Sequence, residues 1–415
     1  MIKRATFITL ICICTAFVSC KKGNNTPPKL STGKNLILTP LEQQKATTDN
    51  AFTFKLYNAI GAGDNTTDNI MVSPLSVSFA MAMTSNGANG ETLTGIRNAM
   101  DFNGFSQADL NTYYNNLITN MPQLDPNTTL SIANSIWYKQ GADVLSPFIT
   151  VNTNSYKAQV QALDFSSASA VQTINNWVSA ETNGKIPTIL NSIPSNAFMY
   201  LINALYFKST WNEKFDASAT TPSSFYLANG STVQSSFMHG TIDANTYHDS
   251  NVSIIELPYS NKKYSMVIVE PSSTNTLKDL SSTLDSAKWA GWMSSLSADK
   301  AQVALPKFSF SYSILLNDAL KSLGMSIAFS DLADFSNISA TRLQISAVQH
   351  KTFVAVDETG TTAAAATSVG VVSSAEPIDP VVYNIDHPFI FVIREMSTGL
   401  VLFAGEVNNP TLKGE

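Results

Sequence analysis

The chain has 415 residues, a formal net charge of −6, 44% hydrophobic residues and only 13% charged residues. This composition is typical of a globular protein with a large core. The sequence contains no basic stripe that would neutralise phosphates, which argues against nucleic acid as a partner.

The first residues have the features of a secretory signal. Lys3 and Arg4 precede an apolar run at 5–18 that is too short for a comfortable transmembrane helix. The run leads through small residues to Cys20, which resembles a bacterial lipoprotein signal, where the cysteine receives lipid before cleavage. We therefore expect a signal peptide at 1–19 and an exported, lipid-anchored protein of the bacterial cell envelope, attached to the outer membrane or the cell surface. An ordinary signal with an incidental cysteine is the alternative.

Cysteines occur only in this region, at Cys12, Cys14 and Cys20. A mature chain that starts at Cys20 has no partner for an internal disulfide, so packing alone must hold the fold together. The segment 20–48 is polar and rich in Lys, Asn, Thr and Pro, which indicates a flexible tether.

Apolar residues at helical spacing predict a helix at 50–60, at the start of the folded part. Further helices are predicted at 76–85, 90–100, 168–181 and 314–323, and strands at 199–207, 252–257, 264–269 and 389–394. Strands and helices do not alternate regularly, which argues against a doubly wound parallel sheet. No linker interrupts the pattern, so we expect a single α+β domain at 49–415.

The sequence contains none of the common catalytic or metal-binding motifs. None of the histidines has a second ligand at metal spacing; they are His239, His248, His350 and His387. The sequence has no GxSxG elbow, phosphate loop or dinucleotide fingerprint. We therefore expect no enzyme, no metal and no cofactor, with an unrecognised hydrolase as the alternative.

Several short motifs occur in the order and spacing of one protein family. They are NIMVSPLS at 69–76, NGANGET at 86–92, TNGKI at 182–186, NALYFKSTW at 203–211, ELPY at 256–259, DHPFIF at 386–391 and FAGEV at 403–407. Together they resemble the serpins, over about residues 51–411. The resemblance implies a monomeric single-domain fold with a large central β-sheet, two smaller sheets, about eight or nine helices and an exposed reactive-centre loop at about 358–382.

The beginning of this loop resembles the hinge of an inhibitory serpin. The hinge positions are Glu358, Gly360, Thr361, Ala363, Ala364, Ala365 and Ala366. In that family a target protease cleaves the exposed loop, whose N-terminal part then inserts into the central sheet as a new strand and carries the acylated protease along. The resemblance implies a suicide-type protease inhibitor, with a non-inhibitory surface or binding protein of the same fold as the alternative.

The residues from 360 to 375 suit an inserted central strand. They include no proline, which lacks the ladder donor, no charge, which a buried face would desolvate, and no large side chain. The inserted part would span roughly 45–50 Å at ~3.3 Å per residue. Gly360, at the bend, can absorb an unusual backbone angle. A flexible surface loop rich in alanine is the alternative interpretation.

Family spacing places the cleaved bond at about Ser374–Ala375, with Val371, Val372 and Ser373 as neighbouring candidates. Small residues suit the narrow pocket of an elastase-like serine protease or a tolerant subtilisin-like one, and papain-like cysteine proteases are also considered. The loop contains no Lys or Arg, which argues against trypsin-like targets.

Five positions elsewhere match named positions of the central sheet in serpins. Ser73, Ser76, Asn203 and His350 match the polar cluster called the shutter, where the central strands part. Trp211 matches the position called the breach, near the upper end of the sheet, where we expect it to be a core aromatic with a packing role only. Considered alone, His350 would be a satisfied core histidine.

Overall fold

The structure is a computed structural model that describes residues 32–61, 68–272, 276–362 and 380–414. Residues Gly33–Glu415 form one compact unit, to which the following description applies. The predicted signal peptide, Cys20, the hinge alanines at 363–366 and the reactive-bond candidates at 371–375 lie outside the described residues.

The central sheet has six strands in the order β10-β11-β12-β4-β2-β3. Their bounds are β10 Phe308–Leu315, β11 Gln349–Asp357, β12 Gly360–Thr361, β4 Met199–Thr210, β2 Thr129–Lys139 and β3 Gln159–Leu163. Neighbouring strands are antiparallel, except that β2 and β3 are parallel. Side chains of β11 alternate between buried and half-buried, as expected for an antiparallel strand with one face on the core.

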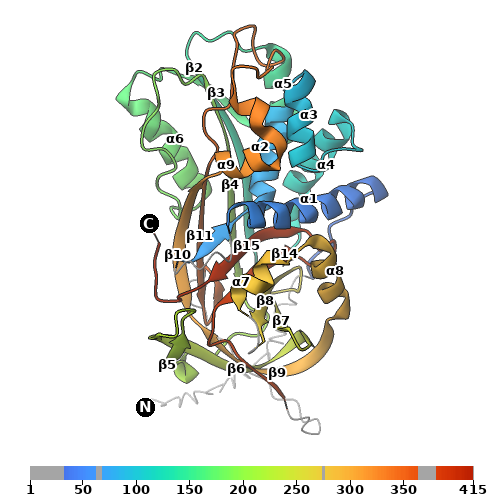
Figure 1. Cartoon of the computed structure of the whole chain (residues 1–415), viewed down its shortest axis with the longest axis vertical. Coiled ribbons are helices and arrows are strands. Elements are labelled where there is room, and N and C mark those ends of the chain that lie inside the picture. The colour runs from blue at the N-terminus through green and yellow to red at the C-terminus, as the bar shows by residue number, and fades with distance from the viewer. Residues whose placement is uncertain (1–31, 62–67, 273–275, 363–379, 415) are drawn as a thin grey trace, which may run out of the picture. The chain divides into compact units, whose positions relative to one another are not determined.

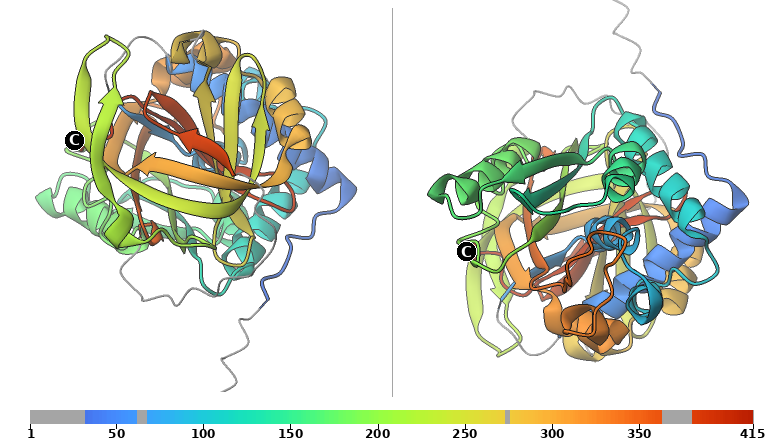
Figure 2. Two further views of the ribbon diagram at one scale, coloured as in Figure 1. Left: turned by 90° about the horizontal axis from the view of Figure 1, so that it is seen from below. Right: turned by 90° about the horizontal axis from the view of Figure 1, so that it is seen from above.

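A second sheet has the order β1-β15-β14-β8-β7-β6-β9-β13, and β5 pairs with β6. The bounds are β1 Ile70–Val72, β15 Val401–Val407, β14 Phe389–Glu395, β8 Tyr264–Pro271, β7 Val252–Pro258, β6 Thr232–His248, β9 Ser297–Pro306, β13 Val381–Asn384 and β5 Thr221–Tyr226. Because β6 pairs with both β7 and β9, it joins the two smaller sheets expected from the resemblance into one ladder. Figure 2 shows β6 and β9 side by side across one end of the molecule.

The described residues contain nine α-helices. Their bounds are α1 Pro40–Ala59, α2 Pro74–Ser85, α3 Gly90–Ala99, α4 Gln107–Asn120, α5 Ser146–Tyr156, α6 Ala168–Glu181, α7 Leu277–Ser282, α8 Ser286–Ser295 and α9 Asn317–Leu320. Figure 1 shows α2–α6 gathered at one end of the molecule, and β5, β6 and β9 at the other. The α+β prediction is therefore confirmed. None of the helices in the described ranges is long and apolar enough to cross a membrane.

The folded part begins earlier than the sequence predicts. α1 starts at Pro40, within the segment 20–48 that we expected to be a flexible tether. The side chain of Thr39 accepts a hydrogen bond from the backbone of Glu42, whose carboxylate accepts one in return, and Lys45 is buried. A reciprocal N-cap of this kind fixes the start of a helix. The sequence analysis did not predict this start because the segment is mostly polar.

The helix predicted at 314–323 is wrong at its start. Ile314 and Leu315 are the last residues of β10, where they pair with His350 and Gln349 of β11. The helix α9 begins only at Asn317. Apolar spacing across a strand end and a following helix resembles one continuous helix, so the period alone cannot separate them.

Candidate functional site

The predicted hinge begins inside the central sheet. The chain leaves β11 at Asp357, reverses direction and returns as β12 between β11 and β4. Gly360 and Thr361 pair with β11 on one side, and with Thr210 and Ser209 of β4 on the other. The strand that we expect to insert starts at 360, and its first two residues therefore already occupy a central position in the sheet.

Gly360 is required at this bend for two reasons. Its φ is +151°, which side-chain-bearing residues rarely adopt, and a Cβ atom would lie 2.1 Å from the carbonyl oxygen of Ser209. The next residues continue the strand: the N–H of Thr362 donates to the carbonyl of Ala355 over 2.6 Å, and its hydroxyl donates to the carbonyl of Phe207 over 2.7 Å. The described chain ends at this point and resumes at 380.

An ion pair fixes the turn before β12. The ammonium of Lys307, which follows β9, lies 2.8 Å from Oε2 of Glu358, and the hydroxyl of Thr220 donates to Oε1 over 2.8 Å. Burial opposes ionisation of Glu358, but the hydrogen bonds from Lys307 and Thr220 and the lysine charge outweigh it and hold the pKa below its usual range. Glu358 is thus held as a carboxylate.

Trp211, which directly follows β4, contacts the same turn. Its indole Nε1–H donates to the carbonyl of Asp357 and its backbone N–H to that of Thr359, both over 2.9 Å. Its ring stacks on Tyr259, with centroids 4.6 Å apart, and the hydroxyls of Tyr259 and Thr361 are 2.5 Å apart. The sequence suggested only packing at the breach position; the structure adds these polar contacts.

Beyond Thr362, no backbone hydrogen-bond ladder joins β4 to β11 in the described residues. Two of the 12 residues of β4 pair with β12, which leaves ten, a length of roughly 33 Å at ~3.3 Å per residue. A cavity of ≈ 940 Å³ lies at the end of this gap that is far from β12, and its lining includes β4 at 199–203, β11 at 349–351 and part of α2. The sheet therefore has an open position for one further strand.

The four predicted shutter residues lie together beside this gap. Ser73 donates its backbone N–H to Nε2 of His350 over 3.0 Å and its hydroxyl to a backbone carbonyl of β15. The Ser73 hydroxyl also accepts the N–H of Ser76, whose hydroxyl donates to the carbonyl of Asn203 over 3.4 Å. A hydrogen-bonded chain thus joins β11, α2 and β4.

Two members of this cluster have distinctive chemistry. Burial lowers the pKa of His350 to about 4, so the ring is neutral near pH 7. Because Nε2 accepts a hydrogen bond, the proton of the neutral ring is on Nδ1. Oδ1 of Asn203 is buried and has no hydrogen-bond partner among the described residues, so the cavity lining contains an acceptor that is still available.

Sequence reasoning missed the side chains that hold the turn. Lys307, Thr220 and Tyr259 were not among the predicted site residues, although Tyr259 belongs to the quoted ELPY motif. Lys307 lies between β9 and β10, two strands that the sequence analysis did not predict, so no sequence signal marked it for a special role.

Comparisons with known proteins agree with these features. The family model described as Serpin (serine protease inhibitor) matches residues 47–410. The human leukocyte elastase inhibitor is 32% identical over 382 residues, which cover 89% of this chain and 100% of that protein.

Two solved structures are also similar. The thermophilic serpin tengpin in its native state has a TM-score of 0.80 at 33% identity, covering 92% of this chain and 97% of its own. Human thyroxine-binding globulin, complexed with thyroxine, has a TM-score of 0.81 at 28% identity, covering 90% of this chain and 100% of its own.

Proposed function

The chain belongs to the serpin family, and from this premise we propose that it is a suicide-type protease inhibitor. The loop between β12 and β13 is the bait. A serine protease attacks it and forms an acyl-enzyme through its nucleophilic serine, releasing the new amino terminus of the C-terminal part. The N-terminal part of the loop then extends β12 and carries the acylated protease along the sheet before water hydrolyses the ester.

The single observation that supports this proposal best is the position of β12. Gly360 and Thr361 already lie between β4 and β11, and the sheet beyond them has an open strand position beside a cavity of ≈ 940 Å³. The sequence that follows, up to 375, has no proline, no charge and no large side chain. It can therefore continue the strand without burying a charge or losing a ladder donor.

The proposed targets are elastase-like or subtilisin-like serine proteases. The bond is assigned to Ser374–Ala375, with Val371, Val372 and Ser373 as alternatives, since all of these side chains are small enough for a narrow specificity pocket. The likeness to the leukocyte elastase inhibitor is consistent with this class of target. Papain-like cysteine proteases form a thioester acyl-enzyme in the same way and are the secondary targets.

The test is a titration of the chain that begins at Lys21 with an elastase and, separately, with a subtilisin. We expect a complex that survives boiling in SDS, and a released C-terminal peptide whose mass places the cut at Ala375 or a close neighbour. We also expect the cleaved protein to melt at a higher temperature than the intact one, because insertion adds a central strand. Cleavage without a complex and without a rise in melting temperature contradicts the proposal.

A binding protein of the same fold is the second candidate, favoured by the likeness to thyroxine-binding globulin. It would use the scaffold for a ligand and not for protease capture. A loop that is cleaved by several proteases, never with a stable complex, would favour this candidate over the inhibitor.

We further propose that Cys20 is lipidated and anchors the protein to the bacterial envelope. The sequence before it has the charged and apolar regions of a secretory signal, and a diacylated amino terminus binds a membrane stably. Growth with a labelled fatty acid should label the wild-type chain and the Cys14→Ser control but not the Cys20→Ser variant. Label that persists in Cys20→Ser contradicts lipidation at this residue.

A further inference from the structure

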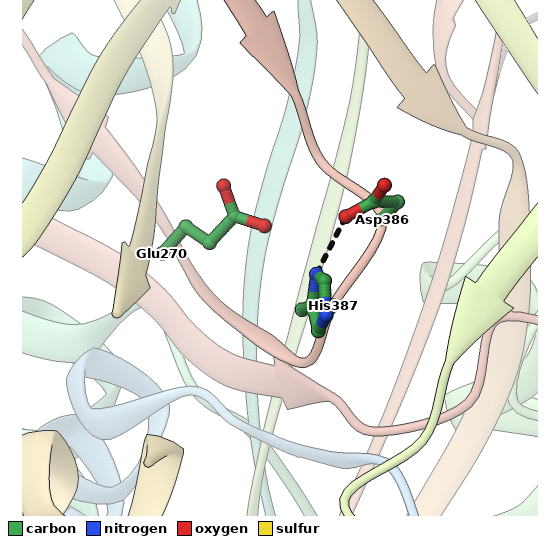
Figure 3. Close-up of side chains that lie close together, drawn as sticks. All are labelled: Glu270, Asp386 and His387. Carbon is green, nitrogen blue, oxygen red and sulfur yellow. Dashed lines mark hydrogen bonds and ion pairs between the residues drawn. The ribbon is translucent and has the colours of Figure 1, made fainter. Parts of the chain in front are cut away.

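Glu270, Asp386 and His387 come together where the chain passes from β13 into β14. Glu270 lies near the end of β8, and the other two residues lie in the short connection after β13. One possible ligand atom from each residue lies within 4.8 Å of the other two. Figure 3 shows the carboxylate of Glu270 and the side chains of Asp386 and His387 directed toward one another.

Neighbouring strands hold this connection in place. The N–H of Tyr226, at the end of β5, donates to the carbonyl of Asp386 over 2.8 Å, and the N–H of Ile385 donates to the carbonyl of Ala304 on β9 over 2.9 Å. The Tyr226 ring also stacks on the His387 ring, with centroids 5.0 Å apart and planes 18° apart. The ligand atoms are thus preorganised by backbone and ring contacts from β5 and β9.

The cluster brings two carboxyl groups close to one imidazole ring. Nδ1 of His387 lies 2.5 Å from Oδ1 of Asp386. Burial, followed by the negative charge of Asp386, raises the pKa of Glu270 to about 8. A cation bound between the carboxylates would favour the ionised form of both.

We propose that Glu270, Asp386 and His387 bind one divalent transition-metal ion of the zinc type, with water completing the coordination. An imidazole nitrogen beside two carboxylates suits zinc and its neighbours, whereas calcium and magnesium prefer oxygen ligands alone. Metal–ligand bonds of ~2.0–2.2 Å in a tetrahedron place ligand atoms about 3.3 Å apart. Nδ1 of His387 and Oδ1 of Asp386 lie closer than this, at 2.5 Å, and all three ligand atoms lie within 4.8 Å of one another. Rotations of these side chains would therefore complete the site.

The expected consequence is a local increase in stability. Glu270 belongs to β8, whereas Asp386 immediately follows β13, which pairs in parallel with β9. The ion links these two parts of the second sheet and resists detachment of β13 from β9. Amide hydrogen exchange in β13 should therefore slow in the presence of zinc, independently of any protease.

The test is calorimetric titration of the purified chain with ZnCl₂ near neutral pH, and with CaCl₂ in parallel. We expect one zinc ion per chain with a micromolar dissociation constant, and weaker binding of calcium. The Glu270→Gln variant keeps the side-chain shape and should weaken zinc binding at least tenfold, as should His387→Gln. The control is His248→Ala, which removes the histidine of the other histidine–aspartate dipeptide and should leave the affinity unchanged.

Three results would overturn the proposal: no zinc binding, binding that is unchanged in both ligand variants, or tighter binding of calcium than of zinc. If a variant does not fold, crystals of the wild-type chain soaked in zinc decide the matter. An anomalous peak at bonding distance from the three side chains supports the site, and a peak elsewhere alone contradicts it.

Discussion

The backbone N–H of Ser73, at the N-cap of α2, donates a hydrogen bond to Nε2 of His350 on β11. This contact joins the buried helix to the edge of the open strand position. Only a neutral imidazole can accept it, because both ring nitrogens carry protons in the charged form. The charge of His350 is therefore coupled to the hydrogen-bonded arrangement of the shutter residues.

Acid should destabilise the fold through His350. The unfolded residue has a pKa of 6.5, and burial lowers the folded value to about 4. Between these values the unfolded chain binds more protons, so the stabilising contribution is fully present above pH 6.5 and is lost as pH falls toward 4. The full change is on the order of 3 kcal/mol.

The check is the midpoint of thermal unfolding against pH, at one fixed heating rate. His350→Gln should remove most of the decline between pH 6.5 and 4, whereas His248→Gln, at an exposed position, should retain it. An identical pH profile for wild type and His350→Gln would exclude His350 as the titrating group.

Gly360→Ala should displace β12. The added methyl group meets the carbonyl of Ser209, and φ at this position is also unfavourable for alanine. Gly230→Ala is the matched control, since Gly230 has a φ of +82° but open space around it. We expect the control to cost ~1–2 kcal/mol from backbone strain alone, and Gly360→Ala to cost more and to increase hydrogen exchange at Thr361. Equal effects of the two substitutions would show that the close approach to β4 is unimportant.

Lys45→Met should destabilise the fold strongly. The Lys45 ammonium is buried, lies 2.7 Å from Oδ1 of Asp49 and is surrounded by the rings of Phe102, Phe105, Tyr113 and Tyr114. Burial lowers its pKa, and Asp49 partly offsets that effect. Removing the lysine leaves Asp49 as an uncompensated buried charge, which typically costs about 3–5 kcal/mol.

The double variant Lys45→Met with Asp49→Asn should recover part of this loss, because the buried charge is then gone as well. Thermal unfolding of the two single variants and the double variant gives the coupling between the residues. Strictly additive effects would contradict an energetically coupled pair.

A charge in the proposed inserting segment should convert the inhibitor into a substrate. Ala365→Arg places a guanidinium on a strand that must enter the sheet, which slows insertion and lets the acyl-enzyme hydrolyse. We expect at least a tenfold fall in the yield of SDS-stable complex, with cleavage preserved. Val382→Arg is the control, because Val382 is 67% exposed on β13; it should leave the yield unchanged. Complex formation by Ala365→Arg at the wild-type level would contradict insertion of this segment.

Regular elements with strong patterns were predictable from the sequence. The helix expected at 168–181 coincides with α6, and the strands expected at 252–257 and 389–394 lie within β7 and β14. These segments have periodic apolar residues or continuous apolar runs, and such patterns can be recognised within a short stretch of sequence. The 17 residues of β6 show irregular burial instead, because this strand has different neighbours along its length.

The contacts that organise the site were not predictable in the same way. Lys307 and Glu358 are distant in the chain, and nothing local to either residue indicates the other. The same holds for Glu270 and Asp386, which no spacing rule connects. Family motifs pointed to Trp211 and His350, but their hydrogen-bond partners depend on how β4, β11 and the following turn lie in three dimensions.

The position of β15 has a consequence for biosynthesis. All residues of β15 are buried, and it lies between β14 and β1, the latter formed by residues 70–72. β1 therefore has no sheet to join until a segment more than 300 residues later has been made. Contacts of such high sequence separation form slowly during folding. Nearly the whole polypeptide must therefore be synthesised before the native second sheet can assemble.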